Sequence, residues 1–153
     1  MVTEFKSVDD ILDFAIKNEE DACIFYTELS GKMIKPAMVQ MFKDFAREEE
    51  GHKAKLLDIK SGKLLIPSKE KVLDLKIADY IDTDIQIKED LDYQDALVLA
   101  MAKEKQAFKL YTDLASRTDN EQIKTLFLAI AQEEAKHKLR FELEYDEIVL
   151  TDN

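Results

Sequence analysis

The chain has 153 residues, of which 46% are apolar and 36% are charged, and its formal net charge is -11 at pH 7. This length fits one domain with its own core, and the negative charge argues against nucleic-acid binding because a phosphate backbone would be repelled. The single cysteine, Cys23, excludes an internal disulfide and the paired-cysteine knuckles of a rubredoxin or a zinc ribbon.

Residues 7–60 are predicted to form a helical hairpin. Ser7 followed by Asp10 is an N-cap signal at the start of an apolar-periodic run. The segment from Gly31 to Pro36 predicts the end of the first helix and the start of the second, with the proline at an initial helical position.

Residues 61–91 are predicted to connect this hairpin to a second one. The segment 69–80 is compatible with a short helix, but its hydrophobic period is unclear. About 30 residues can run the full length of a helix of roughly 25 residues, which is about 38 Å long. The spacing therefore permits a long crossover, as in ferritin-like four-helix bundles.

Residues 92–147 are predicted to form the second hairpin. Asp92 followed by Asp95 gives the N-cap signal, and Thr118 and Asp119 can break and recap the chain between the two helices.

The second hairpin repeats the first. A shift of 85 residues aligns residues 7–60 with 92–145 and gives 14 identities among 54 positions. The elements Glu49-x-x-His52 and Glu134-x-x-His137 fall on this match without a gap. The two halves are therefore copies of one unit, which carries its polar residues with it.

Six polar residues interrupt the apolar stripes of the four predicted helices. They are Glu19, Glu49, His52, Glu104, Glu134 and His137. Glu19 lies 14 residues before a turn centred near residue 33, and Glu49 lies 16 after it, so both reach one level of an antiparallel hairpin. If the two hairpins pack about a pseudo-twofold axis, all six residues meet midway along the bundle.

Four buried carboxylates require compensation, because burial of each ionised group costs several kcal/mol and like charges repel. No lysine or arginine lies in the apolar stripes. Two divalent metal ions would supply four positive charges, with the histidines as neutral ligands. Carboxylate and imidazole ligands suit iron or manganese better than a closed thiolate zinc site.

The doubled motif resembles the rubrerythrin-type branch of the ferritin-like di-iron carboxylate proteins, over essentially the whole chain. The resemblance rests on AIKNEEDACIFYTELS with FKDFAREEEGH, and on AMAKEKQAFKLYTDLA with FLAIAQEEAKH. It implies an all-α, ferritin-like four-helix bundle made of two repeated helical hairpins with a long crossover, in one domain over residues 1–153.

The resemblance also implies a role for each residue of the motif. Glu19 and Glu104 would be terminal ligands, Glu49 and Glu134 bridging ligands, and His52 and His137 the nitrogen ligands of two iron ions, with manganese or a mixed pair as alternatives. Tyr26 and Tyr111 match tyrosines that hydrogen-bond the ligand carboxylates, although a core role with a satisfied hydroxyl is equally compatible with the sequence.

Two positions depart from the rubrerythrin pattern. The family has a further glutamate one turn after the third-helix ligand, where this chain has Ala107, and that glutamate takes part in a redox-linked metal shift. The chain also ends at Asn153 without the cysteines of a rubredoxin domain, so we expect a separate, rubredoxin-type electron donor.

Several functions agree with these residues. The leading hypothesis is an oxidoreductase whose di-iron centre reacts with hydrogen peroxide or dioxygen and is reduced by an external donor. The alternatives are a ferroxidase or iron-handling protein, a manganese catalase, and a structural bundle that merely binds metal.

The remaining expectations concern residues and surfaces outside the motif. We expect Cys23 to be a small core hydrophobe, and Glu48 and Glu133 to have an outer, solvated role. No stretch reaches 18 apolar residues and the N-terminus lacks an apolar core region, which predicts a cytoplasmic protein without a membrane span. The family resemblance implies a homodimer.

Overall fold

Four α-helices make up the secondary structure of the part of the chain that the structure describes. The structure is a computed structural model, and it describes residues 7–62, 87 and 91–152. The helices are α1 (Val8–Lys32), α2 (Pro36–Lys60), α3 (Tyr93–Ser116) and α4 (Glu121–Asp152). The predicted connection over residues 61–91, with its short helix near 69–80, lies almost entirely outside the described residues.

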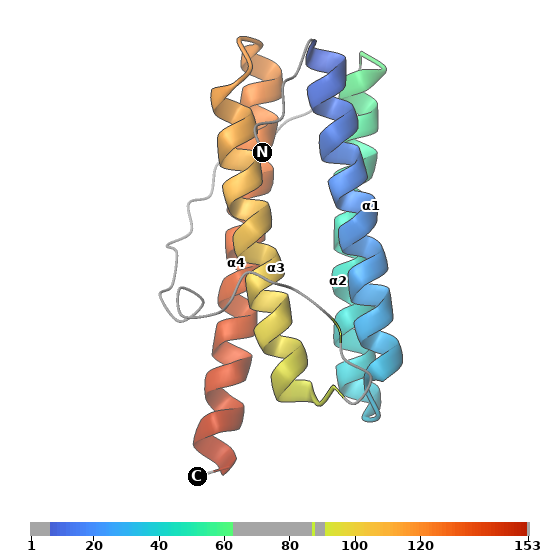
Figure 1. Ribbon diagram of the computed structural model, residues 1–153, viewed down its shortest axis with the longest axis vertical. Helices are drawn as coiled ribbons and strands as arrows, with labels where there is room; N and C mark the ends of the chain where they lie inside the picture. The colour runs from blue at the N-terminus through green and yellow to red at the C-terminus, as the bar shows by residue number, and fades with distance from the viewer. Residues whose placement is uncertain (1–6, 63–86, 88–90, 153) are drawn as a thin grey trace.

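The helices pair as two antiparallel hairpins. Helix α1 packs along α2, α3 packs along α4, and α1 also contacts α3 (Figure 1). The prediction of an all-α, ferritin-like bundle made of two helical hairpins is confirmed.

The same side-chain cap begins the first helix of each hairpin. Ser7 Oγ accepts a hydrogen bond from the Asp10 amide at 3.2 Å, and Asp92 Oδ1 accepts one from the Asp95 amide at 2.8 Å. Each cap satisfies a backbone donor that the helix itself leaves unpaired. Both predicted N-caps are confirmed, and they fix where each hairpin starts.

The two hairpin turns differ from each other. Helix α1 continues through Gly31 to Lys32, and α2 begins with Pro36 at its first position, as predicted. In the second hairpin, the cap of α4 is Asn120, whose Oδ1 accepts from the Ile123 amide at 3.1 Å. The prediction that Thr118 and Asp119 recap the chain is therefore wrong by one residue.

Two apolar clusters fill the interior, one toward each end of the bundle. One contains Tyr26, Phe42, Phe45 and Phe141, toward the turn between α1 and α2. The other contains Leu12, Leu56, Tyr111 and Phe127, toward the opposite end. Burial of these side chains is the main favourable contribution to folding. The polar residues of the repeated motif lie between the two clusters.

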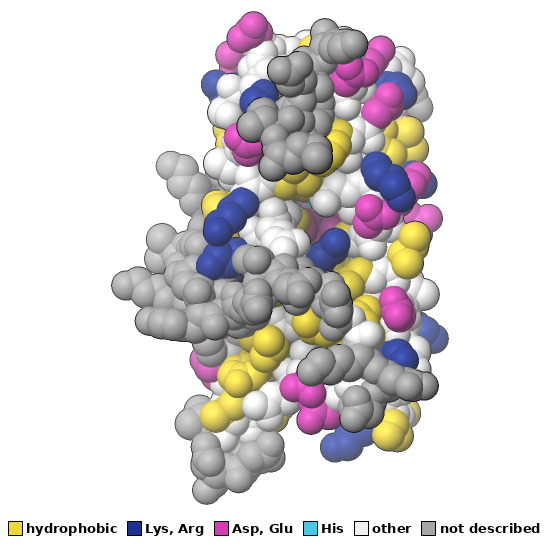
Figure 2. All heavy atoms as spheres, in the orientation of Figure 1, with side chains coloured by type: hydrophobic (Ala, Val, Ile, Leu, Met, Phe, Trp, Pro, Cys, Tyr) yellow, Lys and Arg dark blue, Asp and Glu magenta, His cyan; other side chains and the backbone are white. Residues whose placement is uncertain are grey.

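The outer surface carries charges of both signs. On the face drawn in Figure 2, acidic and basic side chains are interspersed along the helices, with apolar side chains between them. Within the described ranges, no helix is long and apolar enough to cross a membrane.

Candidate metal centre

Six buried polar side chains converge between the two apolar clusters. Helix α1 provides Glu19, α2 provides Glu49 and His52, α3 provides Glu104, and α4 provides Glu134 and His137. None of the six is more than 6% exposed. The structure thus brings together all six residues that the sequence pattern singled out.

Each imidazole faces carboxylates from both hairpins. His52 Nδ1 lies 3.6 Å from Glu19 Oε2 of its own hairpin and 2.9 Å from Glu134 Oε1 of the other. His137 Nδ1 lies 3.5 Å from Glu104 Oε1 of its own hairpin and 3.4 Å from Glu49 Oε1 of the other. The repeat of the sequence is therefore a repeat of geometry.

The six residues form two overlapping groups that could each hold a metal ion. One group is Glu19, Glu49, His52 and Glu134, and the other is Glu49, Glu104, Glu134 and His137, with the ligand atoms of each group within 4.8 Å of one another. Glu49 and Glu134 belong to both groups. A carboxylate has two oxygens, so these two residues are placed to bridge a pair of ions.

The donor atoms of this cluster fit a metal. Among the described residues, each of the six has one buried atom without a hydrogen-bond partner: Glu19 Oε2, Glu49 Oε1, His52 Nδ1, Glu104 Oε2, Glu134 Oε1 and His137 Nδ1. A buried polar group left unpaired costs about 1–3 kcal/mol. Metal ions would coordinate these atoms together and remove that cost.

The electrostatics of the cluster lead to the same conclusion. Burial, together with the charges of Glu104 and Glu19, raises the pKa of Glu49 to about 8. Burial and the neighbouring carboxylates also raise the pKa of Glu134 well above its usual value. Burial alone would lower the pKa of His52 and His137. The hydrogen bonds and charges of the surrounding carboxylates have the larger effect, so the pKa of each histidine is raised. Without metal, the cluster therefore takes up protons, which metal cations would displace.

Two tyrosines hold the carboxylates of the facing hairpin. Tyr26 of α1 donates its hydroxyl hydrogen bond to Glu104 Oε1 of α3 at 2.5 Å, and Tyr111 of α3 donates to Glu19 Oε1 of α1 at 2.5 Å. Both rings are fully buried. Each hydrogen bond occupies one oxygen of its glutamate, while the other oxygen is buried without a hydrogen-bond partner.

The role of Glu48 and Glu133 differs from the sequence prediction. Glu48 Oε2 lies 2.8 Å from His137 Nε2, and Glu133 pairs with His52 Nε2, so each carboxylate crosses between α2 and α4. These hydrogen bonds lower the pKa of Glu48, and lower that of Glu133 to about 2. The predicted outer position is confirmed for Glu48, which is exposed, and neither residue belongs to a candidate ligand group, but the prediction missed the contact of each carboxylate with a histidine.

These two contacts decide which imidazole nitrogen faces the cluster. An ionised carboxylate only accepts hydrogen bonds, so the Nε2 atom of each histidine carries a proton. In a neutral imidazole the Nδ1 atom then keeps its lone pair for a metal. Because Glu48 and Glu133 are identical in the repeat alignment, the sequence contained a signal for this role.

A cleft between α2 and α4 opens above the histidines. It has a volume of about 390 Å³ and is lined by both histidines, both crossing glutamates, and the cations Lys55, Lys136 and Arg140, among others. A small molecule that enters the cleft meets the Nε2 side of the imidazoles. The cleft is therefore a candidate route from solvent to the cluster.

One buried ion pair was not expected from the sequence. Lys138 and Glu142 on α4 are each only 1% exposed, and Lys138 Nζ lies 3.5 Å from Glu142 Oε1. The i, i+4 spacing was the available signal for the contact, but not for its burial. Lys138 follows a candidate ligand in sequence, yet its ammonium pairs with a carboxylate outside the six.

Comparison with known proteins agrees with this geometry. The rubrerythrin family model matches residues 10–93 and 95–153. A solved structure of a hypothetical protein from Pyrococcus furiosus is 25% identical, with a TM-score of 0.65 over 94% of this chain and 91% of that chain. An uncharacterized conserved protein from Magnetospirillum magnetotacticum MS-1 shares the fold, with a TM-score of 0.70, 20% identity, and coverage of 92% of this chain and 95% of that chain. None of the curated proteins compared matches the chain.

Since the family match spans nearly the whole chain and the buried glutamates and histidines occupy the repeated motif, the protein belongs to the rubrerythrin family.

Proposed function

We propose that this protein is a di-iron redox protein that reduces hydrogen peroxide with electrons from an external donor. The observation that carries the proposal is the pair of overlapping ligand groups that share Glu49 and Glu134. Family membership supports a metal-binding redox protein in general. The shared carboxylates favour a pair of ions over a single ion, and reduction of peroxide to water requires a pair of electrons.

Each of the six residues has a distinct task in this proposal. Glu49 and Glu134 would be shared by the two ions, Glu19 and His52 would complete one site, and Glu104 and His137 would complete the other. The four carboxylates balance the charge of two divalent ions. When bound, the iron pair supplies two electrons at adjacent positions.

The surrounding residues hold the ligands in place and control access. Tyr26 and Tyr111 fix the terminal carboxylates, and Glu48 and Glu133 fix the imidazoles. The apolar clusters at either side exclude bulk water, which strengthens the electrostatic interactions inside. A molecule as small as peroxide enters through the cleft between α2 and α4.

An electron donor outside these 153 residues returns the electrons. The single cysteine cannot form the four-cysteine site of a rubredoxin. We therefore assign the donor role to a rubredoxin-type protein or a comparable small carrier.

Ala107 favours a second candidate function, which is iron oxidation by dioxygen as part of iron handling. The residue is buried one turn after Glu104, where the family resemblance places a further glutamate ligand. Alanine provides no oxygen for a metal, so the redox-linked ligand exchange of rubrerythrin is not available at this position.

Anaerobic mixing of the reduced, iron-loaded protein with hydrogen peroxide tests the leading candidate. We expect rapid loss of about one peroxide per iron pair, followed by repeated turnover when a donor is supplied. Replacing both Glu49 and Glu134 with alanine should abolish both the initial loss of peroxide and the turnover. The matched control is Glu50→Ala, because Glu50 is the exposed neighbour of Glu49. Reaction with dioxygen but not with peroxide would reject peroxide reduction and favour iron oxidation.

A further inference from the structure

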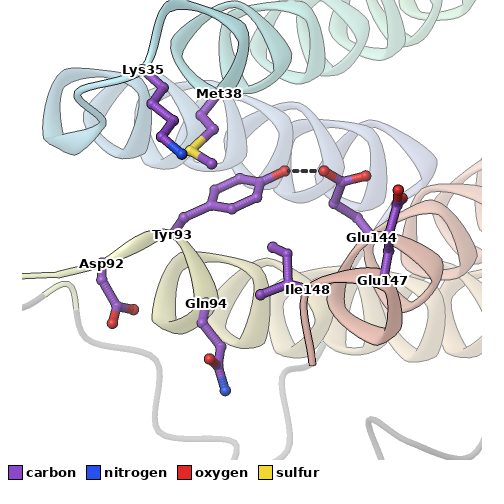
Figure 3. A pocket seen from close by; sticks show the side chains of 8 residues that line it. All are labelled: Lys35, Met38, Asp92, Tyr93, Gln94, Glu144, Glu147 and Ile148. Atoms are coloured by element: carbon purple, nitrogen blue, oxygen red, sulfur yellow. Dashed lines mark hydrogen bonds between the residues drawn. The ribbon is translucent and has the colours of Figure 1, made fainter. Parts of the chain in front are cut away.

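A pocket at the end of the bundle near the α1–α2 turn contains a tyrosine paired with a carboxylate. The pocket has a volume of about 470 Å³ and lies between α2, α3 and α4 (Figure 3). Tyr93 extends from the start of α3, and its hydroxyl donates a hydrogen bond to Glu144 Oε1 of α4 at 2.7 Å. Tyr93 is partly exposed, so its ring lies at the boundary between solvent and core.

A series of aromatic rings connects Tyr93 with the metal centre. The Tyr93 ring meets Phe42 edge-on at a centroid distance of 6.2 Å, and Phe42 stacks on Tyr26 at 6.3 Å. Tyr26 in turn donates its hydrogen bond to Glu104, one of the six residues of the cluster. The path from the pocket to the cluster therefore consists of three rings and one hydrogen bond.

A second branch of rings reaches an imidazole. Phe42 stacks on Phe141 at 6.1 Å, Phe141 lies 4.2 Å from Phe45, and Phe45 meets His137 edge-on at 4.9 Å, all measured between ring centroids. Electron tunnelling falls off less steeply through packed protein atoms than across loosely packed space, so closely packed rings couple the two ends of a path. Both branches provide such packing.

The repeat shows that core packing alone does not require a ring at several of these positions, although Tyr26 and Phe42 do correspond to Tyr111 and Phe127. In the aligned positions of the other hairpin, Phe25 corresponds to Leu110, Phe45 to Ile130, Phe141 to Leu56 and Tyr93 to Val8. Glu144 likewise corresponds to Ile59. The cluster near Tyr93 thus has rings at several positions where the other cluster has aliphatic residues, and it ends in a tyrosine–carboxylate pair at the pocket.

We propose that Tyr93 is an auxiliary one-electron donor to the metal centre, with Glu144 as the acceptor of its phenolic proton. This inference rests on the proposed reduction of hydrogen peroxide. It applies to a centre that holds only one reducing equivalent when peroxide arrives, and that therefore cannot supply both electrons itself.

The electrons and protons of this step balance. The O–O bond of peroxide breaks, and two electrons and two solvent protons convert it into two water molecules. One electron comes from the centre and the other from Tyr93 through Phe42 and Tyr26. The phenolic proton passes to the Glu144 carboxylate, which leaves a neutral tyrosyl radical on Tyr93, a protonated Glu144 and a fully oxidised centre.

The local chemistry of Tyr93 supports coupled loss of the electron and the proton. Burial, followed by the hydrogen bond to Glu144, raises the pKa of Tyr93 above its usual value. The phenol is therefore protonated at neutral pH and needs an acceptor when it is oxidised. The acceptor is in place, and the pocket gives a reductant access to the ring.

Freeze-quench electron paramagnetic resonance tests the inference. The iron-loaded protein is first oxidised, then given one electron per centre, and finally mixed anaerobically with hydrogen peroxide. We expect an organic radical whose signal narrows when the protein contains ring-deuterated tyrosine. The signal should be lost in Tyr93→Phe and retained in Tyr145→Phe, because Tyr145 packs against the same cluster but, among the described residues, has no ring contact with Phe42 or Tyr26.

A second variant separates the proton acceptor from the ring. Glu144→Gln keeps the size of the side chain but removes the carboxylate, so the radical should form more slowly while the fold is unchanged. A radical of equal amplitude in Tyr93→Phe overturns the inference. So does the absence of a radical in a wild-type protein that, when fully reduced, consumes peroxide. If the fully reduced protein does not consume peroxide, the proposed function fails and the inference fails with it.

Discussion

Replacement of Glu49 by glutamine should stabilise the metal-free protein. Burial and neighbouring carboxylates raise the pKa of Glu49 from 4.5 to about 8, so the folded state binds a proton that the unfolded state releases at pH 7. Each pH unit between 4.5 and 7 costs the folded state about 1.4 kcal/mol, which amounts to roughly 3 kcal/mol at pH 7. Glutamine has nearly the same shape and no proton to take up. A gain of roughly 3 kcal/mol corresponds to about 6–12 °C in melting temperature for a chain of this size.

This advantage of the variant should largely disappear when metal is present. An excess of Mn²⁺ of about 100 times its dissociation constant should stabilise the wild-type protein by about 3 kcal/mol, whereas Glu49→Gln lacks a bridging carboxylate and gains much less. Thermal unfolding followed by circular dichroism, with chelator and then with Mn²⁺, measures both effects.

The extra stability of metal-free Glu49→Gln over the metal-free wild type should grow as the pH rises from about 4.5 to about 8. It should vanish below about 4.5, because a carboxyl with a raised pKa destabilises the fold only above its unfolded pKa. Glu50→Gln is the control. A loss of metal-free stability in Glu49→Gln would refute the reasoning.

Three further predictions concern the same centre. Glu133→Gln and Glu48→Gln should each weaken metal binding by about 10–100-fold with little change in the fold, because each removes the negative charge that is paired with the imidazole of the opposite helix. Competition with a chelating dye measures this. Tyr111→Phe should cost about 1–3 kcal/mol in unfolding free energy by leaving a buried carboxylate oxygen without its donor, and Tyr26→Phe should cost a similar amount in chemical denaturation. Metal binding should release protons, and its apparent affinity should rise with pH through the range near 8, where Glu49 ionises. Calorimetry in buffers of different ionisation enthalpy gives the number of protons.

The sequence allowed the hairpins and the position of the six polar residues to be predicted because both depend on periodicity. Glu19 falls within an apolar stripe, and the 85-residue repeat places Glu104 in the same setting. Such a residue must point inward if the helix buries its stripe. Two hairpins with the same phase then bring their polar residues to one level, whatever the detailed packing.

The roles of Glu48 and Glu133 depended on a contact that periodicity does not specify. Each lies about 100° around its helix from the neighbouring ligand candidate, which on an isolated helix is a solvated position. In the bundle, that side of α2 faces α4, so each carboxylate reaches a histidine of the other helix. Only the packing of the two hairpins against each other reveals the contact.

The cap of α4 depended on a choice among adjacent polar residues. Thr118, Asp119 and Asn120 are all residue types that can cap a helix, and the composition of the turn does not distinguish them. In the structure, the Thr118 hydroxyl accepts from the Asn120 amide, which leaves the Asn120 side chain to cap the helix. Local hydrogen bonding within the turn decides the boundary.

Metal stoichiometry tests the central claim most directly. The protein is purified without chelators, loaded anaerobically with ferrous iron, desalted, and analysed by mass spectrometry for metal and protein. Two overlapping ligand groups predict two iron ions per chain in the wild type and in Glu50→Ala, and loss of both in Glu49→Ala/Glu134→Ala, since the two groups share these residues. A wild-type protein that retains no metal, or a double variant that still holds two ions, would contradict the account.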